Sequence, residues 1–466
     1  MAPRWKLIVE GLGKIEHAEV EVRPLMLFVG ENNSGKSYLA SVLWGLLASS
    51  EPLLSQDLAT AAPWDACRNW VQRRLEARTG AESRYQITSA DRALLGDAFN
   101  EMLAARKDSF IKQIFNSDSA SIKRLQIDVS SQEEAVWIST QNVPSETIDG
   151  DVVRVSVSGQ TQTLSAGVSI HEKDKAFSKD LLIPFLLNMS MFGSTAGSVF
   201  RADGVPRTHD PVYLPASRTG FMLLYKALIS RQIRQLRQVE RAREPRFDLT
   251  SPAIQFAELL AVDLDKDKGN YTEEADFLEA GLGGRVELVP GAVGVNEYVY
   301  YPQGSDTPLT MAMSSSLVTE LAPIILVLRH MAGFPVLILE EPEAHLHPKL
   351  QRRLAQVIVR LIRKGLYVWI TTHSENFCQQ INNFMKLGAL DPSRRAEAQE
   401  KLGYGAQDYL DLDDVTGYQF TLDETGKRST VTELKKTGRG MVMPTFNKEL
   451  IELSREVDFL DQQASE

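Results

Sequence analysis

The chain consists of short apolar runs separated by segments in which apolar residues recur every three or four positions. Alternating apolar residues over 7–22 predict a hairpin of strands, and the uninterrupted apolar run 25–29 predicts a buried strand. From Ser37 to about Ser49 the spacing becomes that of one helix face. The N-terminal part therefore reads as hairpin, buried strand and helix, with a glycine-rich segment between the strand and the helix.

A long middle segment, 51–209, has the pattern of an inserted lobe, in which helices and strands precede a closing helix. We predict helices at 64–77, 91–105, 110–115 and 179–191, and strands at 122–129, 135–139 and 152–157. No motif of known chemistry falls in this segment.

Beyond the insert, a short strand at 212–215 leads through a turn at 216–220 into a long helix over 221–243. Further helices are predicted at 253–264, 273–282, 317–330 and 446–460, strands at 285–289, 297–301, 336–339 and 366–370, and a hairpin around 423–426. Alternation of apolar strands with amphipathic helices predicts an α/β fold.

The composition indicates the size and general class of the protein. A chain of 466 residues, 43% apolar and 24% charged, suits one large domain with an insertion, or two lobes. The N-terminus lacks the apolar run of a signal peptide, and no segment approaches the ~20 apolar residues of a membrane span. We therefore expect a cytoplasmic protein that has no membrane anchor, with Cys67 and Cys378 as reduced thiols. The net charge of -10 opposes indiscriminate binding of nucleic acid but leaves room for a local basic groove.

The glycine-rich segment has the complete pattern G-x-x-x-x-G-K-S. Glycines permit a tight turn in which backbone N–H groups surround a polyphosphate, and the following helix adds the positive end of its dipole. Lys36 would reach the β- and γ-phosphates, and Ser37 would bind Mg²⁺. The pattern predicts an ATP site that contains Gly30, Asn32, Asn33, Ser34, Gly35, Lys36 and Ser37.

Two acids follow the apolar strand 336–339. Glu340 stands where a Walker B acid would hold Mg²⁺, directly or through water, at the carboxyl edge of the sheet. Glu341 is suited to orient or deprotonate the attacking water and is the predicted catalytic residue.

Two further motifs have two interpretations each. His373 follows the strand 366–370 and could be a turn residue or a catalytic one. Ser314, Ser315 and Ser316 precede the helix 317–330, where they could offer hydroxyl and N–H groups to a phosphate or simply cap the helix.

With these motifs in this order, the chain resembles the ABC-type ATPases of the RecF, SMC and OLD (overcoming lysogenisation defect) group. The string EEPEAHLHP at 340–348 is especially similar to OLD-like ATPases, and 213–218, 371–374 and 381–383 add to the likeness. The resemblance implies an ABC-type P-loop ATPase head in which two copies enclose two ATP molecules. His373 would then be a switch histidine at the γ-phosphate, and Ser314 to Ser316 a signature that acts in the partner's site. His345 and His347 would belong to the interface between the copies or would only begin a helix.

One difference from the OLD nucleases changes the activity that we expect. Those proteins carry a Toprim nuclease domain, whereas the segment after His373 is too short for one, and Asp411-Leu412-Asp413 leads into what reads as a plain hairpin. Stand-alone ATPases of this kind are subunits of anti-phage systems such as PARIS and Septu. The resemblance thus implies a regulatory ATPase that controls a separate effector, a nuclease. The alternatives are a RecF- or SMC-like DNA repair ATPase and a transporter's nucleotide-binding subunit.

Four arginines, Arg231, Arg234, Arg237 and Arg241, form a stripe along the helix predicted at 221–243. The stripe could bind DNA phosphates, an acidic partner or only solvent. The expected division is an ATPase head from two parts (1–50 and 281–400), the inserted lobe 51–209, a helical part 210–280 and a C-terminal hairpin and helix 401–466.

Overall fold

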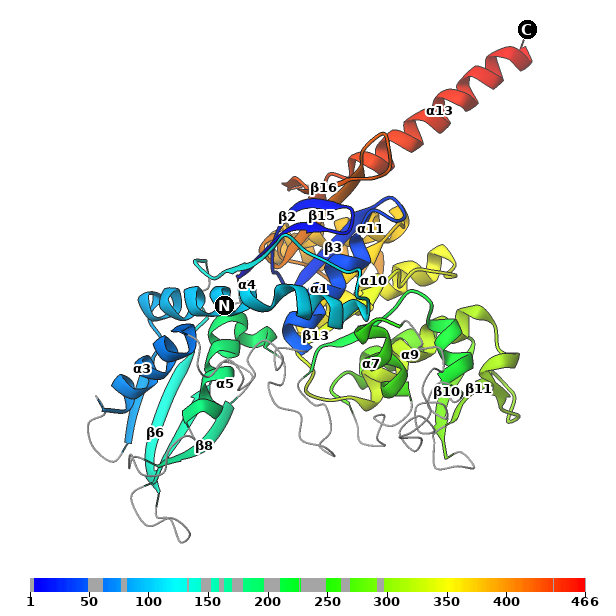
Figure 1. The fold of residues 1–466 in the computed structure, drawn as a ribbon. Helices are drawn as coiled ribbons and strands as arrows, with labels where there is room; N and C mark the ends of the chain where they lie inside the picture. Colours follow the sequence, from blue (N-terminus) through cyan, green and yellow to red (C-terminus); the bar gives the residue numbers. More distant parts are fainter. Residues whose placement is uncertain are drawn as a thin grey trace, which may run out of the picture.

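The computed structural model describes residues 4–48, 62–76, 82–131, 134–143, 152–158, 163–169, 179–196, 210–225, 227, 249–260, 269–290, 297–438 and 440–465. A nine-stranded sheet crosses the middle of the molecule (Figure 1). Its strands, in spatial order, are β5 (Arg124–Asp128), β1 (Lys6–Leu12), β2 (Ile15–Glu21), β16 (Ser429–Glu433), β15 (Val415–Leu422), β3 (Leu25–Gly30), β14 (Tyr367–Thr372), β13 (Val336–Glu340) and β9 (Val212–Leu214).

The five strands from β15 to β9 are parallel, and the predicted apolar runs form them because these strands are covered on both faces. In β3, alternate residues enter two different cores: Leu25, Leu27 and Val29 face one, and Met26 and Phe28 face the other. The predicted α/β class is therefore confirmed.

Helices cover both faces of this sheet. One core contains α1 (Lys36–Ala48) and α4 (Ser89–Phe115), and the other contains α8 (Thr272–Glu279), α9 (Ser316–His330), α10 (Pro348–Arg363) and α11 (Glu375–Gly388). α7 (Ser251–Glu258) joins α1 through a buried hydrogen bond, in which Nε1 of Trp44 donates to Oε1 of Gln255 at 2.8 Å. α12 (Pro392–Leu402) follows α11.

The segment predicted as an insert contains a second sheet of four antiparallel strands, β4 (Glu82–Gln86), β6 (Trp137–Val143), β7 (Val152–Ser158) and β8 (Thr163–Ser169). Together with α3 (Ala62–Glu76) and α5 (Lys179–Phe192) it forms an arm at one side of the molecule (Figure 1). β4 and β8 were not predicted. The main sheet also reaches into this segment, because β5 pairs with β1.

Several predicted boundaries were wrong. The helices predicted at 91–105 and 110–115 are one helix, α4, which Thr88 and Asp91 begin with a capping box. The helix predicted from Phe221 already begins at Arg218, so the expected turn is shorter. The C-terminal hairpin β15–β16 is no plain hairpin, because β15 pairs with β3 and lies inside the main sheet.

The remaining elements lie beside the sheet or beyond it. Strands β10 (Gly284–Val289), β11 (Glu297–Pro302) and β12 (Leu309–Thr310) form a small sheet, and β17 (Lys436–Thr437) pairs with β18 (Gly440–Met441). The last helix, α13 (Pro444–Ser465), projects away from the rest of the molecule (Figure 1). No helix in the described ranges has the length and apolar character needed to cross a membrane.

Candidate functional site

The register of the parallel strands brings the predicted motifs to one edge of the sheet. Glu340 of β13 is opposite Thr371 of β14, and Thr372 is opposite Val29 of β3. Because the strands are parallel, the P-loop, the acids and His373 all leave the sheet at its carboxyl edge. This edge is where ligands bind in open α/β sheets.

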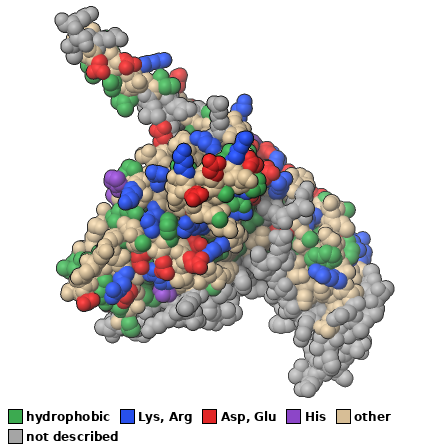
Figure 2. Space-filling model, turned by 180° about the vertical axis from the view of Figure 1, so that it is seen from behind, with side chains coloured by type: hydrophobic (Ala, Val, Ile, Leu, Met, Phe, Trp, Pro, Cys, Tyr) green, Lys and Arg blue, Asp and Glu red, His purple; other side chains and the backbone are tan. Residues whose placement is uncertain are grey.

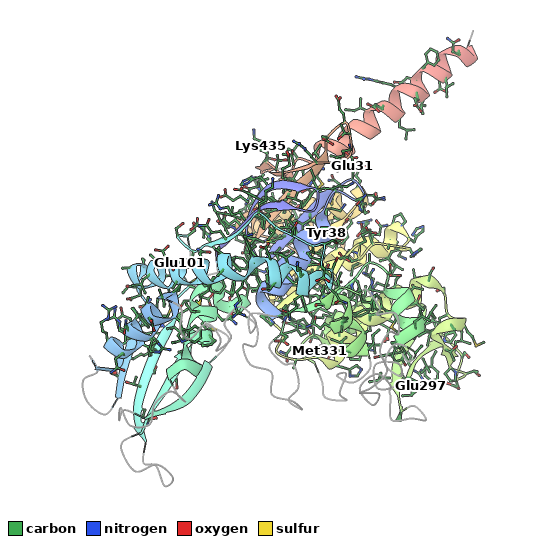
Figure 3. The ribbon with its side chains drawn as sticks, viewed as in Figure 1. Glu31, Tyr38, Glu101, Glu297, Met331 and Lys435 are labelled. Atoms are coloured by element: carbon green, nitrogen blue, oxygen red, sulfur yellow. The ribbon has the colours of Figure 1, made fainter. Side chains whose placement is uncertain are left out.

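The P-loop has the backbone that its glycines were expected to allow. Gly30 and Gly35 have φ of 144° and 103°, and Asn33 has φ of 60°. The buried hydroxyl of Ser34 donates to the carbonyl oxygen of Glu31 at 2.7 Å, which closes the loop. Asn32, Asn33 and Ser37 are exposed, so the loop offers a polar surface at the start of α1, where Figure 3 labels Glu31 and Tyr38.

Lys36 is buried beneath this loop. Its ammonium group donates to the carbonyl oxygens of Gly30 at 3.1 Å and of Glu31 at 2.7 Å. Burial lowers the pKa of Lys36 to about 8, although Glu341 and Glu340 favour the charged form. A phosphate at the loop would supply the missing negative charge and raise this pKa.

Glu340 is fixed by two donors. Tyr213, on β9, donates its hydroxyl to Oε1 of Glu340 at 2.7 Å, and the backbone N–H of Ala216 donates to Oε2 at 3.1 Å. Burial and the charge of Glu340 raise the pKa of Tyr213 well above its ordinary value, so it stays a hydroxyl donor.

Glu341 leaves the strand in a left-handed conformation, with φ of 41°. Such a backbone costs a non-glycine residue about 1–3 kcal/mol and is typical of functional sites. Oε1 of Glu341 lies 3.3 Å from Nε2 of His373, and this hydrogen bond lowers the pKa of the Glu341 carboxyl, against the effect of burial. The two predicted catalytic side chains are therefore in contact.

Glu343 holds the segment that carries His373. Its Oε1 accepts three hydrogen bonds, from the hydroxyl of Thr372 at 2.5 Å, from the N–H of His373 at 2.9 Å and from the N–H of Ser374 at 3.1 Å. Glu343 lies within the string EEPEAHLHP, but its sequence context alone indicates no role for it.

Arg218 is fully buried and joins three elements of the site. Its guanidinium donates to the carbonyl oxygens of Glu340 at 2.6 Å, Glu341 at 3.0 Å and Glu320 at 3.1 Å, and it pairs with the Glu320 carboxylate at 3.0 Å. These contacts brace the acids against α9. A lone acid in the apolar run of α9 was the only sequence signal for Glu320.

The serines predicted to form a signature, Ser314 to Ser316, lie at the start of α9. Ser315 occupies the N-cap position, but its side chain makes no capping hydrogen bond, and Ser315 and Ser316 are exposed. Ser314 donates to the carbonyl oxygen of Thr310 at 3.0 Å. In the described part of the chain, no hydrogen bond joins these serines to the P-loop.

The two histidines of the family string have different positions. His347 is the N-cap of α10, and its Nδ1 accepts from the N–H of Lys349 at 3.3 Å, as expected of a residue that begins a helix. His345 is exposed, with φ of 60°. The basic stripe from Arg231 to Arg241 lies outside the described residues.

The residues present fit ATP and Mg²⁺. The loop offers N–H groups and an ammonium group to phosphates, while the Ser37 hydroxyl and the Glu340 carboxylate are the hard oxygen donors that Mg²⁺ prefers. Each Glu340 oxygen has accepted one hydrogen bond and retains a lone pair. Bound Mg²⁺ would neutralise phosphate charge.

A P-loop after the central strand and paired glutamates after a strand of the same parallel sheet define an ABC-type P-loop ATPase head. Residues 25–378, which include both motifs, match the family described as "AAA domain, putative AbiEii toxin, Type IV TA system", and the chain belongs to this family.

Three solved SMC heads are similar in structure. One is an SmcHead bound to the C-winged helix domain of ScpA, with 14% identity, 93% of this chain and 98% of that chain covered, and a TM-score of 0.34. Another, from Thermotoga maritima, has 11% identity, coverage of 93% and 100%, and a TM-score of 0.31. The third, from Pyrococcus furiosus, has an extended coiled coil and is bound to the C-terminal domain of ScpA; it has 12% identity, coverage of 98% and 100%, and a TM-score of 0.34. No match was found among curated proteins.

Proposed function

We propose that this protein hydrolyses ATP between two copies of itself and that the ATP-bound pair controls a separate effector protein. The exposed serines at the start of α9 support the proposal that ATP is bound between two copies. Ser315 and Ser316 are exposed beside the exposed Met313, and the N-cap hydroxyl is not used within its own helix. A second copy can place this helix start, with its N–H groups, against a phosphate on the P-loop.

Within one copy, the contacts support the following roles. Lys36 and the loop N–H groups bind the phosphates, and Ser37 and Glu340 hold Mg²⁺. Glu341 orients and deprotonates the attacking water, while His373 positions Glu341 and senses the γ-phosphate. The left-handed backbone conformation of Glu341 turns its carboxylate out of the strand.

Two inactive variants, mixed together, test the shared site. Lys36→Ala removes the ammonium group that binds phosphate, and Ser316→Glu places a carboxylate where the partner's phosphate would lie. If the sites are shared, a mixed dimer contains one intact site, and an equal mixture should recover about a quarter of wild-type turnover by random pairing. A mixture as inactive as each variant alone would contradict the shared site.

Glu341→Gln gives an independent test of the chemistry. The amide cannot accept a proton but keeps nearly the same shape, so ATP binding should persist while turnover falls by about 100-fold or more. Sedimentation velocity should then show an ATP-dependent dimer, which Lys36→Ala lacks. Wild-type turnover by Glu341→Gln would mean that another group activates the water.

The regulatory role rests on the resemblance to the ATPases of PARIS and Septu and on the family description, which names a putative toxin of a toxin–antitoxin system. Where a nuclease gene adjoins the gene for this protein, expression of both genes or of either alone in bacteria, followed by phage challenge, tests this role. Protection that needs both genes supports it, whereas sensitivity to DNA damage after deletion would favour the RecF- or SMC-like alternative.

A further inference from the structure

The projecting helix α13 exposes apolar side chains along its length. Every described side chain from Ile451 to Asp461 is exposed, and Figure 2 shows hydrophobic and acidic side chains together on this helix. The large apolar ones are 50–63% exposed: Ile451, Leu453, Val457, Phe459 and Leu460. Exposed apolar side chains at this density mark an interaction surface.

Three of these side chains form a regular seam. Leu453, Val457 and Leu460 are separated by four and then three residues, the spacing of alternating d and a positions in a coiled coil. In the sequence, Leu450 and Phe446 continue the same spacing toward the start of the helix. We call Leu453, Val457 and Leu460 the α13 seam. Its regular spacing is typical of a helix that packs against another helix.

Acidic residues flank the α13 seam. Helical spacing places Glu456 on one side of the seam and Asp461 on the other, whereas Arg455 lies on the opposite face. The whole helix contains five acidic residues and two basic ones. A parallel pair of two α13 helices would place Glu456 against Asp461 of the other copy, so its flanks would repel. Charge therefore disfavours a second copy and favours a helix that has basic flanks.

The base of α13 is attached to the ATPase head. Asn382 of α11 and Met441 of β18 exchange two buried hydrogen bonds, Nδ2 to the carbonyl oxygen at 3.0 Å and N–H to Oδ1 at 2.8 Å. α11 begins immediately after His373, with Ser374 as its N-cap. A partner on α13 would thus be held next to the helix that follows the predicted switch residue.

We propose that the α13 seam binds a helix of another protein, with leucine-type residues along its apolar stripe and Lys or Arg at the positions on both sides of it. This inference goes beyond ATP hydrolysis and does not depend on it. The acidic flanks select the partner by charge, and the seam supplies the contact area.

Two designed peptides of three heptads test the proposal by fluorescence anisotropy with the full chain. Both carry Leu at a and d, and they differ only in having Lys or Glu at e and g. The chain should bind the Lys peptide at least about ten-fold more tightly than the Glu peptide. Val457→Ser should weaken this binding by about ten-fold or more. Phe459 is more exposed than Val457 but lies outside the seam, so Phe459→Ser should change the binding by less than about three-fold.

Glu456→Lys combined with Asp461→Lys should reverse the preference between the peptides, with the helix content of each variant checked by circular dichroism. Equal effects of the two serine variants, or an unchanged preference, would overturn the proposal. So would a self-associated wild-type chain that Val457→Ser makes monomeric, because the occupant would then be a second copy. Binding to phosphatidylcholine–phosphatidylglycerol vesicles that needs Val457 would assign the seam to membranes instead.

Discussion

Glu343→Ala should slow ATP turnover although Glu343 is not expected to touch ATP. The carboxylate is the acceptor for the three donors that hold the segment from Thr372 to Ser374. Ser374 has a second partner for its N–H, Oγ1 of Thr372 at 3.0 Å, but no other acceptor is found for the N–H of His373 among the described residues. The variant therefore leaves the N–H of His373 and the hydroxyl of Thr372 without the acceptor that holds them.

The size of the effect follows from these contacts. A hydrogen bond to a charged acceptor contributes about 1.5–3 kcal/mol. Of the three that are lost, the bond to the N–H of His373 and part of the bond to Ser374 act on the backbone beside His373, and their loss costs about 2–4 kcal/mol. If this loss raises the activation free energy of hydrolysis, because His373 no longer holds Glu341 in place, kcat decreases by about 30- to 900-fold. The affinity for ATP should change little, because the P-loop hydrogen bonds do not involve Glu343.

Glu343→Gln is the matched control. Its amide oxygen can accept the same three hydrogen bonds, and its NH₂ group would replace Oε2, which has no hydrogen-bond partner in the described structure. Turnover should therefore fall by less than about ten-fold. Steady-state phosphate release at saturating ATP, with affinity from a fluorescent ATP analogue, separates the two quantities. A kcat of Glu343→Ala within about three-fold of wild type, or a Gln variant as slow as the Ala variant, would refute the reasoning.

Two other predictions concern charge and stability. The ammonium of Lys36 deprotonates near pH 8 in the empty site, and bound phosphate favours its charged form, so ATP binding at pH 8–9 should take up a proton and weaken as the pH rises. Calorimetry in two buffers of different ionisation enthalpy measures this uptake, and heats that do not depend on the buffer would contradict it. Arg218→Met should destabilise the head by about 3–5 kcal/mol, because Glu320 keeps a buried charge without its partner. Denaturant unfolding of Arg218→Met with and without Glu320→Met checks this, since the second change should recover part of the loss.

The sequence alone was sufficient to predict the features that are formed by residues next to one another in the chain. A P-loop is a local device: its glycines, Lys36 and the helix that follows are contiguous, so the pattern predicts the ATP site before any tertiary contact is known. The same holds for Glu340 and Glu341, which follow an apolar strand directly. Predictions failed where the local pattern was ambiguous. The single helix α4 was predicted as two helices. The hairpin β15–β16 was predicted, but the periodicity of its residues does not show that β15 lies inside the main sheet.

Only the tertiary structure decided which distant residues support these motifs. Tyr213 reaches Glu340 across 127 positions of sequence, and Arg218 reaches the carbonyl oxygen of Glu341 across 123. The register of β9 against β13 and of β13 against β14 creates these contacts, and register is set by packing over the whole sheet. Glu343 finds its partner Thr372 only because two parallel strands end at the same edge of the sheet. Parallel strands are joined by long crossover connections, so the residues at their ends are far apart in the sequence. The local sequence therefore does not indicate which strand ends will meet.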